Sequence, residues 1–128
     1  MAKEPRTPRI SDAEWEVMNA VWDGHPVAAG DVIARLAQRT DWSARTVKTL
    51  LGRLVRKGAL GFEVAGRHYL YHPRVSRERC VKAESRSFVE RVLGGRTSPL
   101  LVHLVREANL SAAEIDELRR VLGEKEAS

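Results

Sequence analysis

The segment from Ser43 to Leu60 reads SARTVKTLLGRLVRKGAL and has the periodicity of a single amphipathic helix. Ser43 is a favourable N-cap, because its hydroxyl can accept a hydrogen bond from a free amide of the first turn, and Gly58 suits the left-handed residue that ends a helix. At about 100° per residue, one face collects only apolar side chains: Val47, Leu50, Leu51, Leu54 and Val55. We therefore predict that this helix, near residues 43–57, packs against a hydrophobic core.

The opposite face of this helix is basic and hydroxylic. The segment contains no acidic residue, whereas solvent-facing helices usually mix signs to gain i,i+4 pairs. Arginine, lysine and threonine side chains bind phosphate oxygens and base edges, so we predict a nucleic-acid-binding face rather than an ordinary solvated one. Gly52 on this face costs about 1 kcal/mol of helix stability relative to alanine, and it either permits close approach of a ligand or is simply tolerated. The cations, all expected to lack acidic partners, are Arg45, Lys48, Arg53, Arg56 and Lys57.

Positive charge is unevenly distributed along the 128 residues. The formal net charge is +5; residues 1 to 79 hold 14 lysines and arginines against 9 acids, and residues 80 to 128 hold 8 against 8. This division predicts a part that binds a polyanion and a neutral part with another role, such as self-association. The length fits one domain, or a compact domain with an appendage, and a hydrophobic content of 43% is sufficient for a core.

Two shorter helices are predicted before the basic one. Residues 1–9 contain two prolines and no apolar pattern, so we expect a flexible basic arm. Ser11 and Glu14 fit a capping box that opens a helix ending before Gly24 and Pro26. The apolar residues of that helix, at helical spacing, are Trp15, Met18, Val21 and Trp22.

A tight turn joins the next helix to the basic one. Residues 27–29 are expected to be extended, and Asp31–Arg39 should form a helix with Val32, Ile33 and Leu36 on one side. Only residues 40–42 then separate it from Ser43. Two helices joined so closely, the second with a basic outer face, predict a helix-turn-helix that places its second helix in the major groove of DNA.

After Gly58 the apolar period changes from 3.6 to 2, which predicts a two-stranded hairpin near residues 60–72. Leu60, Phe62 and Val64 alternate with other residues, residues 65–67 supply a turn, and His68 to His72 return until Pro73 ends the strand. Three helices followed by a hairpin make a winged helix. Arg67 at the hairpin tip either reaches a neighbouring phosphate or the minor groove, or is an ordinary exposed turn residue.

Three more helices are predicted after the hairpin: one from Ser76 to Leu93, one opened by Ser98 and Pro99, and one opened by a second capping box at Ser111. So small a neutral segment buries too little apolar surface alone, and we expect it to pair with a second subunit. We thus predict a mainly α fold with a small β-hairpin wing, divided into an arm (1–9), a winged helix-turn-helix DNA-binding domain (10–74) and a helical dimerisation domain (75–128). The expected dimerisation residues are Phe88, Val92, Leu101, Leu104, Ile115, Leu118 and Leu122.

Signals for catalysis, metals and membranes are absent from the sequence. The four histidines are scattered, and there is no HExxH, no Cys-x-x-Cys and no serine in a glycine elbow, so we predict no enzyme, no cofactor and no metal site. The single cysteine, Cys80, excludes an internal disulfide and is either a small semi-buried residue or a redox sensor. Without a signal peptide or a long apolar run, we expect a cytoplasmic protein with no membrane insertion.

Four stretches together resemble the penicillinase-repressor (BlaI/MecI/CopY) family: ISDAEWEVMNAVW, SARTVKTLLGRLVRKGAL, RHYLYHP and LLVHLVREANLSAAEIDELRRVL. The resemblance runs from about Ile10 to Leu122, and its most specific motif is T-V-x-T-L-L-x-R-L-x-x-K-G. It implies a homodimeric bacterial transcriptional repressor that binds pseudo-palindromic operators overlapping promoters. The residues implied or expected to contact DNA are Arg45, Thr46, Lys48, Thr49, Arg53 and Arg56 on the helix and Arg67 on the wing.

The resemblance also implies a route of release. In antibiotic-resistance members, a membrane-sensor metallopeptidase leads to cleavage between an asparagine and a phenylalanine in the fifth helix. The corresponding pair here is His103 and Leu104, which differs from the familiar pair and leaves the protease and the signal open. Copper-responsive members carry Cys-x-Cys pairs near the C-terminus, and this chain has only Cys80, so copper sensing of that type is not expected.

Two alternatives to this reading remain open. One is a winged-helix repressor that senses a metal or an oxidant directly through Cys80. The other is a winged helix used as a protein-interaction module, which would need no DNA. Phosphate neutralisation predicts a steep fall of DNA binding as salt rises, and a protein-interaction module predicts negligible DNA affinity even at low salt.

Overall fold

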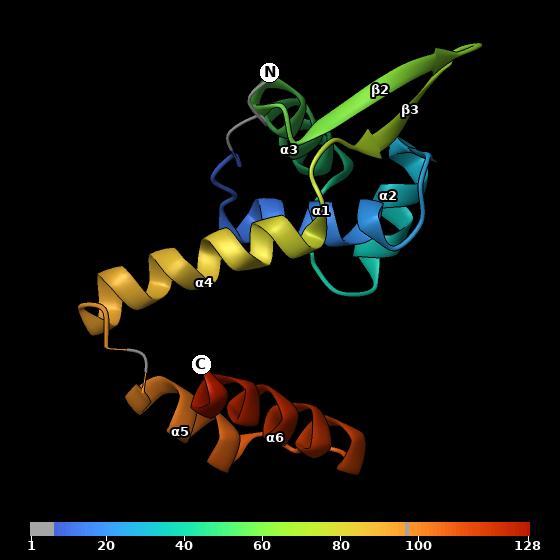
Figure 1. Ribbon diagram of the computed structural model, residues 1–128. Helices are drawn as coiled ribbons and strands as arrows, with labels where there is room; N and C mark the ends of the chain where they lie inside the picture. Colours follow the sequence, from blue (N-terminus) through green and yellow to red (C-terminus); the bar gives the residue numbers. More distant parts are fainter. Residues whose placement is uncertain (1–6, 97) are drawn as a thin grey trace. The chain divides into compact units, whose positions relative to one another are not determined.

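The computed structural model describes residues 7–96 and 98–128 (Figure 1). The chain separates into two compact units, one up to Arg86 and the other from Ser87 to Ser128. The predicted mainly α fold with a small β wing is confirmed. The functional boundary predicted after residue 74 stays a prediction, and most of the predicted arm lies outside the described residues. The elements are α1 (Asp12–Trp22), β1 (Val27–Ala28), α2 (Ala29–Ala37), α3 (Ala44–Lys57), β2 (Leu60–Ala65), β3 (His68–Pro73), α4 (Arg77–Leu93), α5 (Ser98–Glu107) and α6 (Ala112–Ala127).

The helix ends that carry local signals lie where they were predicted. The Ser11 hydroxyl accepts from the Glu14 amide, and the Glu14 carboxylate accepts from the Ser11 amide, which completes the capping box of α1. Ser43 caps α3 by accepting from the Thr46 amide, and Gly58 ends that helix with φ +83°. Both signals act within a few residues of the helix terminus, which is why the sequence alone locates them.

Helix α2 is displaced from its prediction. It spans Ala29–Ala37 rather than Asp31–Arg39, and its N-cap, Ala28, supplies no side-chain hydrogen bond. The reason lies in β1, because Ala28 is extended and paired with β3, so the chain enters the helix directly from the strand. The predicted inner side of this helix is confirmed, since Val32 and Leu36 are buried and Ile33 packs partly buried against the core.

One hydrophobic core holds α1, α2 and α3 to the base of the sheet. The first helix contributes Val17, Met18 and Val21, and its Trp15 and Trp22 rings pack against the core edge with centroids 5.7 Å apart. The core residues beyond α1 are Ile10, Val27, Val32, Leu36, Val47, Leu50, Leu51, Leu54, Ala59, Leu60 and Cys80. The apolar face predicted for α3 is therefore its buried face, with Val55 partly buried at the margin.

The predicted hairpin near residues 60–72 is present as β2 and β3, and it is part of a three-stranded antiparallel sheet with strand order β1-β3-β2, in which β1 is an additional strand. Val27 pairs with Tyr71 and Ala28 with Leu70, while β2 and β3 pair from Leu60 and Pro73 outward to the turn. Figure 1 shows this hairpin extending away from the three helices. Residues 27–29 were expected to be extended, but a strand of two residues lacks the alternation that reveals longer strands, so its pairing with β3 was not predicted.

Contacts between α1 and the start of α4 attach that helix to the first unit. The Trp22 indole donates to the Val75 carbonyl at 3.0 Å, and Arg77 pairs with Asp23 at 2.8 Å while lying 5.3 Å from the centre of the Trp22 ring. The predicted cap at Ser76 is present, because its hydroxyl accepts from the Arg79 amide. Cys80 is buried in the core, in agreement with the reading of a small packing residue.

The second unit contains the end of α4, together with α5 and α6. Gly94 and Gly95 end α4 with positive φ, and Ser111 opens α6 through the predicted capping box with Glu114. Neither α5 nor α6 buries a side chain. In the described ranges, none of the helices has the length and apolar character needed to cross a membrane.

Candidate nucleic-acid interface

The outward face of α3 gathers every helix residue predicted to contact DNA. Burial of Val47, Leu50, Leu51 and Leu54 on the inner side turns the remaining positions to solvent. The exposed residues on this outward face are Arg45, Thr46, Lys48, Thr49, Arg53 and Arg56. The geometry thus brings them onto one surface, and their contact with DNA stays a prediction.

The two threonine hydroxyls on this face are held by local hydrogen bonds. The Thr46 hydroxyl lies 3.1 Å from that of Ser43, and the Thr49 hydroxyl donates to the Arg45 carbonyl at 3.0 Å. A hydroxyl that donates a hydrogen bond to a backbone carbonyl can still accept one through its oxygen. The Thr49 hydroxyl can therefore still accept a hydrogen bond from a ligand at the outward face.

Charge on the outward face is unbalanced. Across residues 7–96 and 98–128, no carboxylate lies within ion-pairing distance of Arg45, Lys48, Arg53 or Arg56. Like charges on neighbouring turns of a helix destabilise it, and a bound polyanion relieves that repulsion. These four cations are accordingly suited to a phosphate backbone.

Lys57 departs from the prediction that all five cations of the helix lack acidic partners. Its ammonium group contacts Oε1 of Glu14 at 2.5 Å and donates to the Arg9 carbonyl at 2.9 Å. Glu14 is 1% exposed. Burial by itself would raise the pKa of this carboxyl, but hydrogen bonds from Lys57 and from Ser11, with the charge of Lys57, hold the pKa below its ordinary value. Lys57 is thus a structural residue that ties α3 to α1.

Gly52 has open space around it. A Cβ atom built on it would meet only the side chain of Arg56, at 3.9 Å. The packing of the chain therefore does not require glycine here, and both explanations given from the sequence, close approach of a ligand to the outward face or a tolerated glycine, remain.

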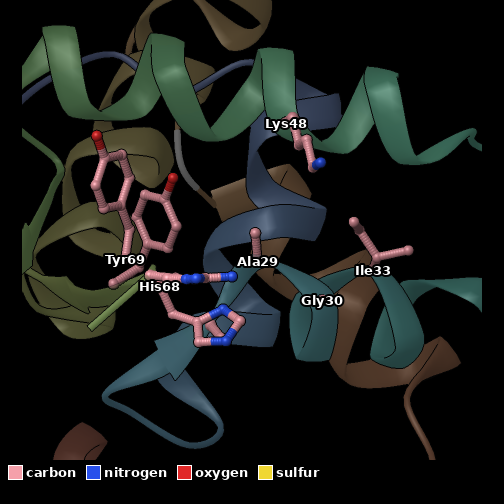
Figure 2. Close-up of a pocket in the computed structure, with 9 residues that line it drawn as sticks. Ala29, Gly30, Ile33, Lys48, His68 and Tyr69 are labelled. Carbon is pink, nitrogen blue, oxygen red and sulfur yellow. The ribbon is translucent and has the colours of Figure 1, made fainter. Parts of the chain in front are cut away.

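A hollow of about 530 Å³ lies beside α3, where Lys48 is the one residue of that helix that lines it (Figure 2). Lys48 extends from α3 toward it, His68 and Tyr69 of the wing stand on one side, and Ala29 and Ile33 of α2 on the other. The remaining lining residues are Ala28, Gly30, Arg67 and Tyr71. Arg67 is exposed at the tip of the hairpin, so the hollow connects the outward face of α3 to the wing.

Among the residues of the hollow, the sequence predicted a contact with DNA only for Lys48 and Arg67. His68, Tyr69 and Tyr71 were predicted only as residues of the returning strand of the hairpin. Burial, followed by the neighbouring Tyr69, raises the pKa of Tyr71, so its hydroxyl keeps its proton. The sequence signal for the wing side of the hollow was a basic turn followed by alternating aromatic residues. The opposite side of the hollow comes from α2, and its position next to the wing could not be inferred without the fold.

Comparison with known proteins places the chain. Residues 10–124 match the family described as "Penicillinase repressor". The chain is 34% identical over 119 residues to the penicillinase repressor of Bacillus licheniformis, covering 93% of each chain. It is 33% identical over 120 residues to the methicillin resistance regulatory protein MecI of Staphylococcus aureus (strain N315), covering 94% of this chain and 98% of that one.

The chain belongs to the penicillinase repressor family. A solved structure agrees: the solution structure of monomeric Bacillus licheniformis BlaI in complex with the blaP half-operator matches with a TM-score of 0.51 and 38% identity, over 57% of this chain and 89% of that one. The resemblance read from the sequence motifs is confirmed. Since members of the penicillinase repressor family are transcriptional repressors, the prediction that this chain is not an enzyme is confirmed as well.

Within this penicillinase repressor family member, Cys80 is a poor candidate for a reactive thiol. Burial raises its pKa, more than the nearby Arg79 lowers it, so the thiolate is scarce at neutral pH. Among the described residues, no three histidine, cysteine, aspartate or glutamate side chains are grouped closely enough to hold a metal ion.

The residues predicted to form the dimer interface are exposed on the single chain. Their exposed fractions run from 37% for Phe88 to 63% for Leu122. The pair predicted as a cleavage site, His103 and Leu104, lies in α5, and both side chains are exposed. The other members of this apolar set are Val92, Leu101, Leu104, Ile115 and Leu118.

Proposed function

We propose that this protein is a homodimeric repressor that sets α3 of each subunit into the major groove of a pseudo-palindromic operator. The observation that carries the proposal is the outward face of α3, where four cations without acidic partners flank two threonines, in a chain of the penicillinase repressor family. Its relative BlaI is described in complex with a half-operator, which supports the same use of this face here. Occupied operator would exclude RNA polymerase from the promoter.

A test of base reading compares Arg53 with Arg56. Wild-type protein first selects a cognate duplex from a random pool, and a scrambled duplex of the same composition serves as the control. Arg53→Ala should cost about 1–3 kcal/mol on the cognate duplex only, because a bidentate contact to a base is lost. Arg56→Ala should weaken both duplexes alike, because a phosphate contact carries no sequence information. Equal losses on both duplexes for Arg53→Ala would refute base reading.

Dependence on salt separates DNA binding from the alternative of a protein-interaction module. Each neutralised phosphate contributes about −0.9 to the slope of log affinity against log salt. We expect a steep negative slope for the wild type. Negligible affinity for any duplex in dilute buffer would favour the module instead.

We further propose that a second copy of the chain covers the apolar surfaces of residues 87–128. Helices α5 and α6 bury no side chain within one chain, and exposed apolar residues of this density are characteristic of an interface between subunits. Leu118→Glu should therefore shift the protein to monomer in sedimentation equilibrium. Asp116→Lys, two residues earlier and on the opposite side of α6, is the matched control and should remain dimeric.

Release is proposed to follow cleavage between His103 and Leu104 by a membrane-sensor metallopeptidase or a protease that it activates. Scission there would separate the end of α5 and all of α6 from the DNA-binding part. Loss of the dimer lowers operator affinity because the second half-site is no longer held at high effective concentration. A chain ending at His103 should be monomeric and should bind the operator weakly; a truncated chain that still dimerised and bound like the wild type would exclude this mechanism.

The relatives suggest the class of gene that is controlled. One is named a penicillinase repressor and the other a methicillin resistance regulatory protein, so we propose an antibiotic-resistance gene as the target. Direct sensing through Cys80 is the competing route of induction. Unchanged induction in cells that carry Cys80→Ser would eliminate that route.

A further inference from the structure

The hollow between α2, α3 and the wing has the composition of a site for an anion. Lys48 approaches it from α3, and Arg67 and His68 approach it from the wing, whereas no lining residue is acidic. Asp31, which lies in the first turn of α2, is not among the residues that line it. Three nitrogen-bearing side chains from two elements therefore converge on one space without a carboxylate to neutralise them.

Small residues keep the floor of this hollow open. Ala28, Ala29 and Gly30 line it at the junction of β1 and α2, and apart from its chain neighbours and the adjacent backbone of α2, no described heavy atom lies within 4 Å of a Cβ built on Gly30. The volume of about 530 Å³ is ample for a phosphate group together with part of its sugar. A larger side chain at Gly30 would project into open space and reduce the volume of the hollow.

The location of the hollow indicates which anion it would meet. This step rests on the proposed function, with α3 in a major groove. The two grooves of B-DNA are separated by a sugar–phosphate strand, so a wing that follows the minor groove beside α3 must straddle that strand. The strand would then pass between α3 and the wing, where the hollow lies.

The aromatic wall of the hollow suits the sugar of such a strand. Tyr69 is 50% exposed and stacks on Phe62 with ring centroids 4.5 Å apart, and Phe62 in turn lies 6.1 Å from Tyr71. These rings share one face of the hairpin with Val64, which is also exposed. Exposed aromatic and apolar side chains on a wing are unfavourable in water, and contact with deoxyribose would remove them from it.

We propose that one backbone phosphate of the operator occupies this hollow and is shared by Lys48, Arg67 and His68, with Tyr69 against the adjoining deoxyribose. His68 and Tyr69 are thereby DNA-contacting residues, and the phosphate links the recognition helix to the wing. Because the contact is to the backbone, it positions the protein without reading sequence.

The sharing of one phosphate is testable by salt dependence, using the cognate duplex selected by the wild type. If Lys48 and Arg67 neutralise the same phosphate, each single alanine variant should change the slope by much less than 0.9 per subunit. The double variant should change it by about 0.9 per subunit, more than the two single changes together. Arg56 and Arg67 form the control pair, whose effects should add. Additive effects for Lys48 and Arg67 would overturn the shared site.

The wing residues are tested on the same cognate and scrambled duplexes. His68→Ala should weaken binding to both by about three- to tenfold, the range for loss of one hydrogen bond, and His68→Gln should restore most of the affinity because it keeps a donor. His72→Ala, on the same strand but outside the hollow, should bind like the wild type. Tyr69→Ala should weaken both duplexes.

The outcomes distinguish this inference from the proposed function. If the wild type prefers the cognate duplex and Arg53→Ala abolishes the preference, but His68→Ala and Tyr69→Ala bind like the wild type, the hollow holds no phosphate and the repressor proposal stands. If the wild type shows no preference for any selected duplex, the proposed function is wrong, and the inference about the hollow, which rests on it, is wrong as well.

Discussion

Replacing Lys57 with methionine removes the ammonium group that contacts Oε1 of Glu14 and the carbonyl oxygen of Arg9. Methionine keeps most of the aliphatic stem, so the change isolates the charge. In the variant, Glu14 retains one donor to Oε1, the Ser11 amide at 2.8 Å, while its Oε2 has no partner in the described structure. The substitution therefore leaves a carboxylate that is 1% exposed with too few hydrogen bonds.

The expected cost follows from the burial of the two partners. Breaking a fully buried ion pair by removing one side costs about 3–5 kcal/mol. The side chain of Lys57 is 38% exposed, and water screens this pair in part, so we expect a loss of about 2–3 kcal/mol in the free energy of unfolding at pH 7.

The loss should depend on pH. In the wild type the pKa of Glu14 is lowered, so the pair contributes fully above the unfolded-state pKa of about 4.3, and this contribution disappears as the pH falls through the lower folded-state pKa. In Lys57→Met, burial without the cation favours the protonated carboxyl. Protonation of Glu14 at low pH then removes the cost of burying its charge in the variant, and it removes the stabilising ion pair in the wild type. The difference in free energy of unfolding between the two proteins should therefore become smaller from pH 7 toward pH 4.

Urea unfolding followed by tryptophan fluorescence measures both effects, with the two proteins at equal concentration because a dimer gains stability with concentration. Arg56→Met is the matched control: it removes the neighbouring exposed cation, which has no carboxylate within pairing distance in the described residues, and should change stability by less than about 0.5 kcal/mol. A Lys57→Met protein as stable as this control at pH 7, or a deficit of equal size at pH 4.5, would refute the assignment of Lys57 as the partner of a buried carboxylate.

Three other substitutions or reactions probe the fold and its proposed interface. Gly52→Ala should raise the unfolding free energy by up to about 1 kcal/mol in thermal melts, yet weaken binding to the cognate duplex, because the added methyl projects from the outward face of α3. Arg35→Ala should lower the free energy measured by urea unfolding by about 1–3 kcal/mol, because its guanidinium donates to the carbonyls of Ala20 at 2.7 Å and Gly24 at 2.9 Å at the end of α1. Cys80 should react with a thiol reagent far more slowly in the native protein than in urea, because burial excludes the reagent and raises the thiol pKa; comparable rates would show that its site is open.

The parts of this fold that could be predicted from the sequence depend on short-range chemistry. Ser11, Ser43 and Ser111 each bond to an amide three residues later, and Gly58 adopts a positive φ where the apolar pattern stops. The two faces of α3 follow from its own periodicity. Because both the caps and the periodicity are complete within one element, the sequence located α3 and the exposed cations of its outward face.

The parts that could not be predicted depend on partners distant in the chain. Lys57 and Glu14 are separated by 43 positions in the sequence, and no local pattern around either residue predicts that the two form an ion pair. Val27 pairs with Tyr71 in the same way, so the extended segment predicted at residues 27–29 could not be recognised as a third strand of the sheet, and the start of α2 was placed too late. The hollow beside α3 depends on both, since its floor comes from the junction of β1 and α2 and its wall from the wing.

The pairing of β1 with β3 supports the base of the wing but not its tip. At Leu70 and Tyr71 the returning strand has neighbours on both sides, whereas His68 and Tyr69 beyond it are bonded only to β2. The base of the wing is therefore held on both sides of β3, next to α2, whereas the tip is held by one neighbouring strand and can bend more easily. Bending at the tip would let the wing adjust to DNA grooves of different width, while the distance between the base of the wing and α3 stays constant.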